Sequence, residues 1–138
     1  MPTHDTPDEG ESVMTYTRVS ADVHGESHFS DEQVTLSETG IAPPAPPVNM
    51  SSPTPAENVA FVTLPAGWPE SVDEPHVAPA RNYWFVLSGE MELTAGDGET
   101  RHFRPGSILL AEDTTGTGHT TTVVSDSPVE LAVVGTAD

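Results

Sequence analysis

The 138-residue sequence contains no cysteine and no lysine. Without cysteine, the chain cannot form a disulfide, use a thiolate nucleophile, or hold zinc or an iron–sulfur cluster through sulfur. Without lysine, it cannot form a lysine Schiff base with a carbonyl substrate. The sequence also lacks a P-loop, a dinucleotide-binding glycine motif and the G-x-S-x-G nucleophile elbow, which removes three common routes to an enzymatic function.

Basic side chains are scarce. The arginines Arg18, Arg81, Arg101 and Arg104 stand against 22 Asp and Glu residues, and the formal net charge is −18. Nucleic acids and anionic membranes bind to basic surfaces, so we expect neither as a partner. An acidic surface of this kind suits a cytoplasm rich in salt, and we favour that halophilic interpretation. An ordinary acidic protein from a GC-rich genome is the alternative.

Long hydrophobic runs are also absent. No apolar stretch approaches the roughly 20 residues of a membrane span, and the polar N-terminus does not resemble a signal peptide, so we expect a cytoplasmic protein. The length suits a single domain. Residues 1–13 are acidic with a single valine and are predicted to form a disordered tail, with Met14 as an alternative start.

The rest of the chain consists of short β-like segments separated by turn residues, with no convincing helical period. Such regular spacing predicts an all-β sandwich or barrel of roughly eight to ten strands. Residues 14–80 are expected to supply N-terminal strands and a proline-rich covering segment at 41–56, and residues 81–138 the core barrel strands. The expected strands are 16–19, 33–36, 58–64, 82–87, 90–94, 99–104, 108–111, 119–124 and 129–134.

Three sequence runs carry a resemblance to a known family. They are YWFVLSGEMEL at 83–93, GDGE at 96–99 and FRPGSILL at 103–110. Their order of strand, Gly-Glu turn, strand, acidic turn and Pro-Gly resembles the cupins, and the run EDTTG at 112–116 before a histidine is similar to a group of small, largely uncharacterised bacterial cupins. The resemblance covers Arg81 to Val134 and implies a double-stranded β-helix, or jelly-roll barrel. It also implies a homodimer, as such small barrels often form.

The cupin metal motif is depleted in this sequence. Counted back from Gly89, the family's glutamate position falls on Asn82, its second histidine on Ala78 and its first on His76. In the second motif, His119 arrives two residues after the expected ligand position. The resemblance therefore implies His76, His119 and Asn82 as candidate ligands of one divalent metal, Zn, Fe, Mn or Ni.

The residues themselves lead to a similar site. Strand alternation places Asn82, Trp84 and Val86 on one face, so we predict a ligand pocket lined by Asn82, Trp84 and His119. A first-row metal takes three or four convergent ligands, and Glu112 or Asp113 is a candidate for the missing carboxylate.

Each histidine also has a structural interpretation. His76 is as well explained by a loop contact as by metal ligation. For His119 we favour a pocket role, because its position after a glycine-rich loop matches the ligand position that the resemblance to cupins implies. His24 and His28 flank a Gly-Glu-Ser run and are able to bind a metal as a pair, but a solvated turn is the favoured interpretation.

We therefore expect a small-molecule-binding cupin-barrel protein with the option of one divalent metal in the barrel mouth. The alternative is a metal-dependent cupin enzyme of the oxygenase, isomerase or lyase type acting on a small organic substrate. A purely structural role is a third hypothesis, because a fold does not fix a function.

Overall fold

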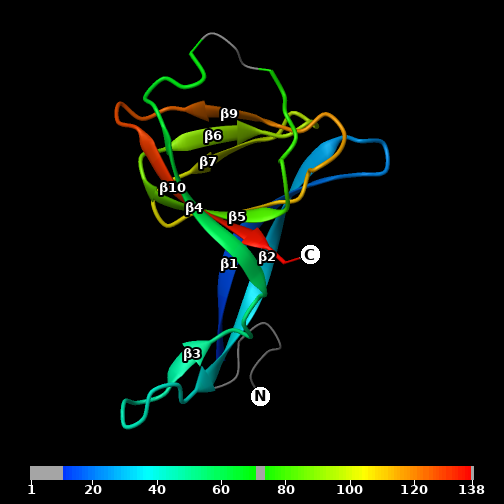
Figure 1. Cartoon of the computed structure of the whole chain (residues 1–138). Coiled ribbons are helices and arrows are strands. Elements are labelled where there is room, and N and C mark those ends of the chain that lie inside the picture. The colour runs from blue at the N-terminus through cyan, green and yellow to red at the C-terminus, as the bar shows by residue number, and fades with distance from the viewer. Residues whose placement is uncertain (1–10, 71–73, 138) are drawn as a thin grey trace, which may run out of the picture. The chain divides into compact units, whose positions relative to one another are not determined.

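The structure is a computed structural model, and residues 11–70 and 74–137 are described here (Figure 1). The described chain contains ten β-strands and divides into two compact units. Unit 1 comprises the described part of Met1–Thr15 together with Glu32–Thr54, and unit 2 comprises Tyr16–Asp31 and Pro55–Asp138. No helix in the described ranges is long and apolar enough to cross a membrane.

Unit 1 is built from the outer parts of two long strands and a short third one. Strand β1 (Glu11–Ala21) and strand β2 (Ser27–Thr39) are hydrogen-bonded neighbours, and β3 (Val48–Met50) pairs antiparallel with β2 at Ser37–Thr39. Strand β1 begins at Glu11, so it overlaps the last three residues of the predicted tail at 1–13. Residues 1–10 lie outside the described residues. The proline-rich segment at 41–56 contains β3, and its residues up to Thr54 belong to unit 1.

Unit 2 contains two facing layers of strands (Figure 1). Within unit 2, the strands of the larger sheet follow the order β2-β1-β8-β5-β10-β4, and those of the smaller sheet the order β7-β6-β9. Strand β1 pairs parallel with β8, whereas β8, β5, β10 and β4 are antiparallel neighbours. The remaining strands are β4 (Ala56–Leu64), β5 (Asn82–Ser88), β6 (Met91–Thr94), β7 (Thr100–Phe103), β8 (Ile108–Ala111), β9 (Thr120–Val123) and β10 (Val129–Thr136).

The core of unit 2 lies between the two layers, because strand alternation turns one side of each strand inward. In β6, Met91 and Leu93 are fully buried, whereas Glu92 and Thr94 are only partly buried. Leu109 of β8 and Leu131 of β10 meet them from the other layer. Full burial of a side chain of this size contributes roughly 1.5–3 kcal/mol, so these four residues form the centre of the fold.

The segment between β4 and β5 runs beside β9 and supplies that edge strand with backbone partners. We call residues 65–70 and 74–81 the closing segment. The amide of Val123 donates to the Trp68 carbonyl at 2.9 Å, and His76 and His119 exchange two backbone hydrogen bonds of 2.9 Å. The Ala78 amide donates to the carbonyl of Asp113 at 3.1 Å. The closing segment therefore covers an otherwise unpaired edge and fixes the approach to His119.

Candidate functional site

His119 lies immediately before β9, and its side chain is fully buried. Its backbone is held by the paired hydrogen bonds to His76. This close approach requires glycine at the preceding position, because Gly118 has φ +79° and a Cβ atom there would lie 2.0 Å from the His76 carbonyl oxygen. The local sequence Gly-His thus places the imidazole on the inner side of the barrel.

Asp113 fixes one nitrogen of the His119 ring. The Asp113 carboxylate oxygen Oδ2 lies 2.5 Å from His119 Nδ1, and both side chains have no exposed surface. With Nδ1–H donating to the carboxylate, a neutral imidazole presents the lone pair of Nε2 on the opposite side of the ring. The same carboxylate–histidine arrangement orients histidine ligands in metal sites and fixes their tautomer.

Three buried polar atoms at this site have no hydrogen-bond partner among the described residues. They are His119 Nε2, Asp113 Oδ1 and Thr121 Oγ1. Buried polar atoms are paired in the great majority of cases, and an unpaired one costs about 1–3 kcal/mol. His119 and Thr121 are two residues apart, so alternation turns both inward. Unpaired polar atoms in a core are an indication of a binding site.

Strand β5 contributes the second side of the site. The Trp84 indole Nε1–H donates to Asn82 Oδ1 at 2.7 Å, and the Trp84 ring meets the His119 ring edge-on with centroids 6.3 Å apart. Asn82 is buried and Trp84 partly buried. The structure thus brings the predicted trio Asn82, Trp84 and His119 together, and their role as a ligand pocket stays a prediction.

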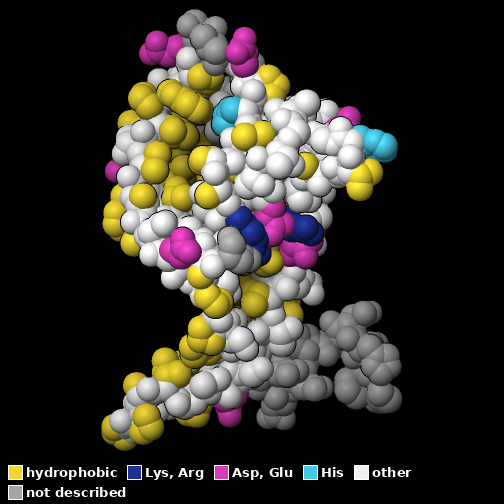
Figure 2. Space-filling model, turned by 45° about the vertical axis from the view of Figure 1, so that its right-hand side comes forward, with side chains coloured by type: hydrophobic (Ala, Val, Ile, Leu, Met, Phe, Trp, Pro, Cys, Tyr) yellow, Lys and Arg dark blue, Asp and Glu magenta, His cyan; other side chains and the backbone are white. Residues whose placement is uncertain are grey.

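Partly buried apolar side chains surround the core of unit 2. Five partly buried hydrophobic residues pack against the core from β4, β5, β10 and the closing segment: Val62, Leu64, Trp68, Trp84 and Val133. Figure 2 shows hydrophobic side chains gathered over one side of unit 2. A small set of polar atoms within an apolar wall is the usual composition of a small-molecule site.

His76 and Glu112 differ in what they contribute. The His76 residue is exposed, with its ring centroid 4.9 Å from that of His119 and its Nδ1 3.5 Å from the Glu74 carbonyl oxygen. Glu112 forms ion pairs with Arg18 and Arg81 instead of approaching His119. Partial burial alone would raise the pKa of Glu112, but the hydrogen bonds from Arg81 and Arg18 outweigh it and hold that pKa below its ordinary value. Of the two candidate carboxylates, only Asp113 reaches His119.

Ser27 is a positioning residue that the sequence analysis missed. Its fully buried hydroxyl donates to the Gly118 carbonyl at 2.8 Å and accepts the Gly96 amide hydrogen at 2.7 Å. It therefore fastens the β8–β9 loop, which carries His119, to the β1–β2 and β6–β7 turns. Sequence offers no signal for this role, because the partners are distant in the chain.

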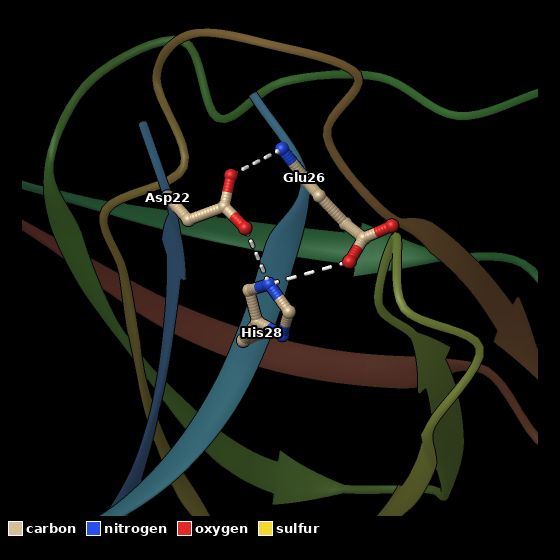
Figure 3. A group of neighbouring side chains, drawn as sticks. All are labelled: Asp22, Glu26 and His28. Atoms are coloured by element: carbon tan, nitrogen blue, oxygen red, sulfur yellow. Dashed lines mark hydrogen bonds and ion pairs between the residues drawn. The ribbon is translucent and has the colours of Figure 1, made fainter. Parts of the chain in front are cut away.

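A second group of titratable side chains lies at the β1–β2 turn (Figure 3). His28 Nε2 lies 2.8 Å from Asp22 Oδ2 and 3.4 Å from Glu26 Oε1, and His28 Nδ1 lies 2.9 Å from Asp97 Oδ2. Asp22, Glu26 and His28 are close enough to hold a metal ion together. The turn that the sequence predicts is present, but His28 is paired with carboxylates and not with His24.

The carboxylates around His28 change its titration. The hydrogen bond to Asp22, followed by that to Asp97, raises the pKa of His28 above its ordinary value. The hydrogen bond to His28 in turn lowers the pKa of Asp22. The histidine contribution to stability is therefore fully present below its unfolded-state pKa and is lost as pH rises through the raised value. The Asp22 contribution is present above the ordinary aspartate pKa and is lost as pH falls through the lowered one.

We expect His28→Gln to reduce stability more at about pH 5 than at about pH 9, because only the protonated imidazole is attracted to these carboxylates. Urea unfolding at both pH values measures the difference between wild type and variant. His24→Gln is the matched control, since that imidazole makes no hydrogen bond within the described part of the chain. A loss of stability that is equal at both pH values would contradict the expectation.

The comparisons with known proteins agree with this geometry. The family model described as a cupin domain matches residues 60–135, which is more than half of the chain. The chain belongs to the cupin family. The predicted all-β cupin barrel is therefore confirmed. The match includes the second half of β4 as well as the segment 81–134 on which the sequence resemblance rested.

Solved structures similar to this cupin have low sequence identity. The cupin domain of Cnp3 from Schizosaccharomyces pombe is 12% identical with a TM-score of 0.46, covering 94% of this chain and 85% of that one. A structure described as that of a putative ethanolamine utilization protein Q from Salmonella typhimurium LT2 is 15% identical with a TM-score of 0.42, covering 92% of this chain and 99% of that one. The search of curated proteins found no match.

Proposed function

We propose that this cupin binds a small organic molecule in the interior of unit 2, beside His119. The observation that carries the proposal is the fully buried His119 Nε2, which has no partner in the described residues although Asp113 holds Nδ1 at 2.5 Å. A ligand that donates a hydrogen bond to Nε2 would remove a cost of about 1–3 kcal/mol. Ligand binding would therefore give a hydrogen-bond partner to a buried nitrogen that the fold alone leaves unpaired among the described residues.

The proposed roles follow from the contacts of each residue. His119 accepts a hydrogen bond from the ligand, and Asp113 is a positioning residue that acts through the His119 ring. Thr121 offers a buried hydroxyl without a partner among the described residues. Trp84 supplies an apolar wall whose indole N–H is already bound to Asn82. Two or three directed polar contacts within an apolar wall are sufficient for specific binding of a small molecule.

We expect fragments that bind wild type to bind His119→Ala at least roughly tenfold more weakly, which corresponds to one hydrogen bond of about 1.4 kcal/mol. A fragment screen followed by titration of tryptophan fluorescence measures this difference. His102→Ala is the matched control, because His102 is an exposed histidine paired with Glu90 at 2.7 Å. Equal loss in both variants, or binding unchanged by His119→Ala, would reject the site.

A metal-dependent cupin enzyme is the second candidate, favoured by the proximity of the His76 and His119 rings. The donor set for its metal is incomplete. Asn82 Oδ1 accepts the Trp84 indole hydrogen, and Asp113 occupies the opposite nitrogen of His119, so no carboxylate joins the two imidazoles. These residues do not supply the three or four convergent donors that a first-row metal takes.

We expect elemental analysis, after expression with iron, zinc, nickel and manganese, to find no metal that depends on His119. Wild type, His119→Ala and His28→Ala are compared. Metal lost only in His28→Ala belongs to the group of Asp22, Glu26 and His28. Stoichiometric metal that is lost in His119→Ala but kept in His28→Ala would contradict the expectation and support the metal-dependent enzyme.

A further inference from the structure

The charges around the barrel restrict what the interior is able to bind. The chain has four arginines and no lysine. Each arginine forms an ion pair, and each of their side chains is at least partly exposed. Arg18 and Arg81 hold Glu112, Arg101 holds Asp31 and Glu99, and Arg104 lies near Glu90. No arginine or lysine is therefore left to neutralise an anion beside His119.

The unpaired polar atoms of the interior are mainly acceptors. Asp113 Oδ1 accepts hydrogen bonds when ionised, and His119 Nε2 accepts when Nδ1–H is donated to Asp113. The indole N–H of Trp84, a donor, is already used by Asn82. The interior thus favours a ligand that brings donors of its own.

Two further features favour a positive charge on that ligand. The Trp84 ring lies beside His119, and the face of an indole attracts an organic cation. The net charge of −18 attracts cations and repels anions on approach. A carboxylate ligand would enter a low-dielectric interior next to the carboxylate of Asp113, with no arginine or lysine to offset the repulsion.

We infer that the ligand of this barrel is a small organic amine, bound as its ammonium ion with an N–H directed at His119 Nε2 and its apolar part against Trp84. This inference rests on the proposed function, since it names the chemical class of the molecule that the site binds. An amine supplies both the hydrogen-bond donors and the charge that the interior lacks.

The test is a set of ligands that differ only in the head group: benzylamine, benzyl alcohol and benzoate, and butylamine, butanol and butyrate. Tryptophan fluorescence and the imidazole resonances of His119 report binding at near-neutral pH. We expect each amine to bind at least about tenfold more tightly than its alcohol, with no detectable binding of the carboxylate. Measurement at molar salt, where the Debye length is about 3 Å, separates this local preference from attraction by the whole protein.

Asp113→Asn is the variant that isolates the charge, because an asparagine keeps the shape and the acceptor oxygen for His119 Nδ1. We expect the advantage of the amine over the alcohol to fall several-fold in this variant and carboxylate binding to improve. An alcohol or carboxylate that binds wild type as tightly as its amine would overturn the inference and leave the proposed function standing. If fragments from the wider screen bind beside His119 but no amine does, the inference alone is overturned; if nothing binds there, both are.

Discussion

Gly118→Ala is expected to destabilise unit 2 by about 3–5 kcal/mol, a large effect for the addition of one methyl group. A Cβ atom at Gly118 would lie 2.0 Å from the His76 carbonyl oxygen and 2.6 Å from the Val77 amide nitrogen. The closing segment would have to move away, and the two hydrogen bonds between His76 and His119 would break. Each such bond contributes about 1 kcal/mol, and the φ of +79° adds strain of about 1 kcal/mol for a residue with a side chain.

Gly67→Ala is the matched control for this experiment. Gly67 lies in the same closing segment with φ +80°, but a Cβ atom there meets nothing within 4 Å. This variant therefore has the backbone strain without the collision, and we expect it to lose only about 1 kcal/mol. Urea unfolding followed by tryptophan fluorescence measures both variants. If both variants lost the same free energy of unfolding, the close approach of Gly118 to His76 would not be what keeps His119 in position.

Asp113→Ala is expected to lower the free energy of unfolding by about 2–4 kcal/mol and to abolish ligand binding beside His119. The substitution leaves a fully buried His119 Nδ1 without its acceptor and creates a cavity where the carboxylate was. It also releases the ring tautomer, so Nε2 is no longer fixed as an acceptor. Stability and binding should therefore fall together.

Thr121→Val provides the contrasting result in the same core. Thr121 Oγ1 is buried and has no partner in the described residues, so replacing the hydroxyl by a methyl group removes an unsatisfied polar atom. We expect stability to be unchanged or higher by up to about 1 kcal/mol. Urea unfolding compares the two variants. A destabilisation by Thr121→Val as large as that by Asp113→Ala would indicate that general packing, and not the held histidine, governs this region.

Most of the barrel was predictable because its strands alternate between the core and the surface. In β5, Asn82 and Val86 are buried and Leu87 is 54% exposed, which is the alternation that the sequence predicts. Strand β3 was not predicted, because its three residues are exposed and follow a proline-rich run. Its pairing with β2 depends on a contact that no local pattern encodes.

The site was less predictable than the fold. His119 was identified because its position after a glycine-rich loop matches a ligand position of the cupins that the sequence resembles, but Asp113 was only one of two candidate carboxylates. Loop residues have no periodicity from which their direction follows, so only the fold separates Asp113, which reaches His119, from Glu112, which turns to Arg18 and Arg81. The position of Ser27 between three turns is likewise a property of the tertiary structure.

The ring nitrogens of His119 are the most direct test of whether this cupin holds a buried acceptor for a ligand. Long-range ¹H–¹⁵N correlation spectra identify which nitrogen carries the proton. We predict a protonated Nδ1 bound to Asp113 and an unprotonated Nε2 whose resonance shifts when a ligand is added, while the Nδ1 proton is retained. A proton on Nε2 with Nδ1 bare, or an Nε2 resonance that no bound ligand changes, would contradict the account.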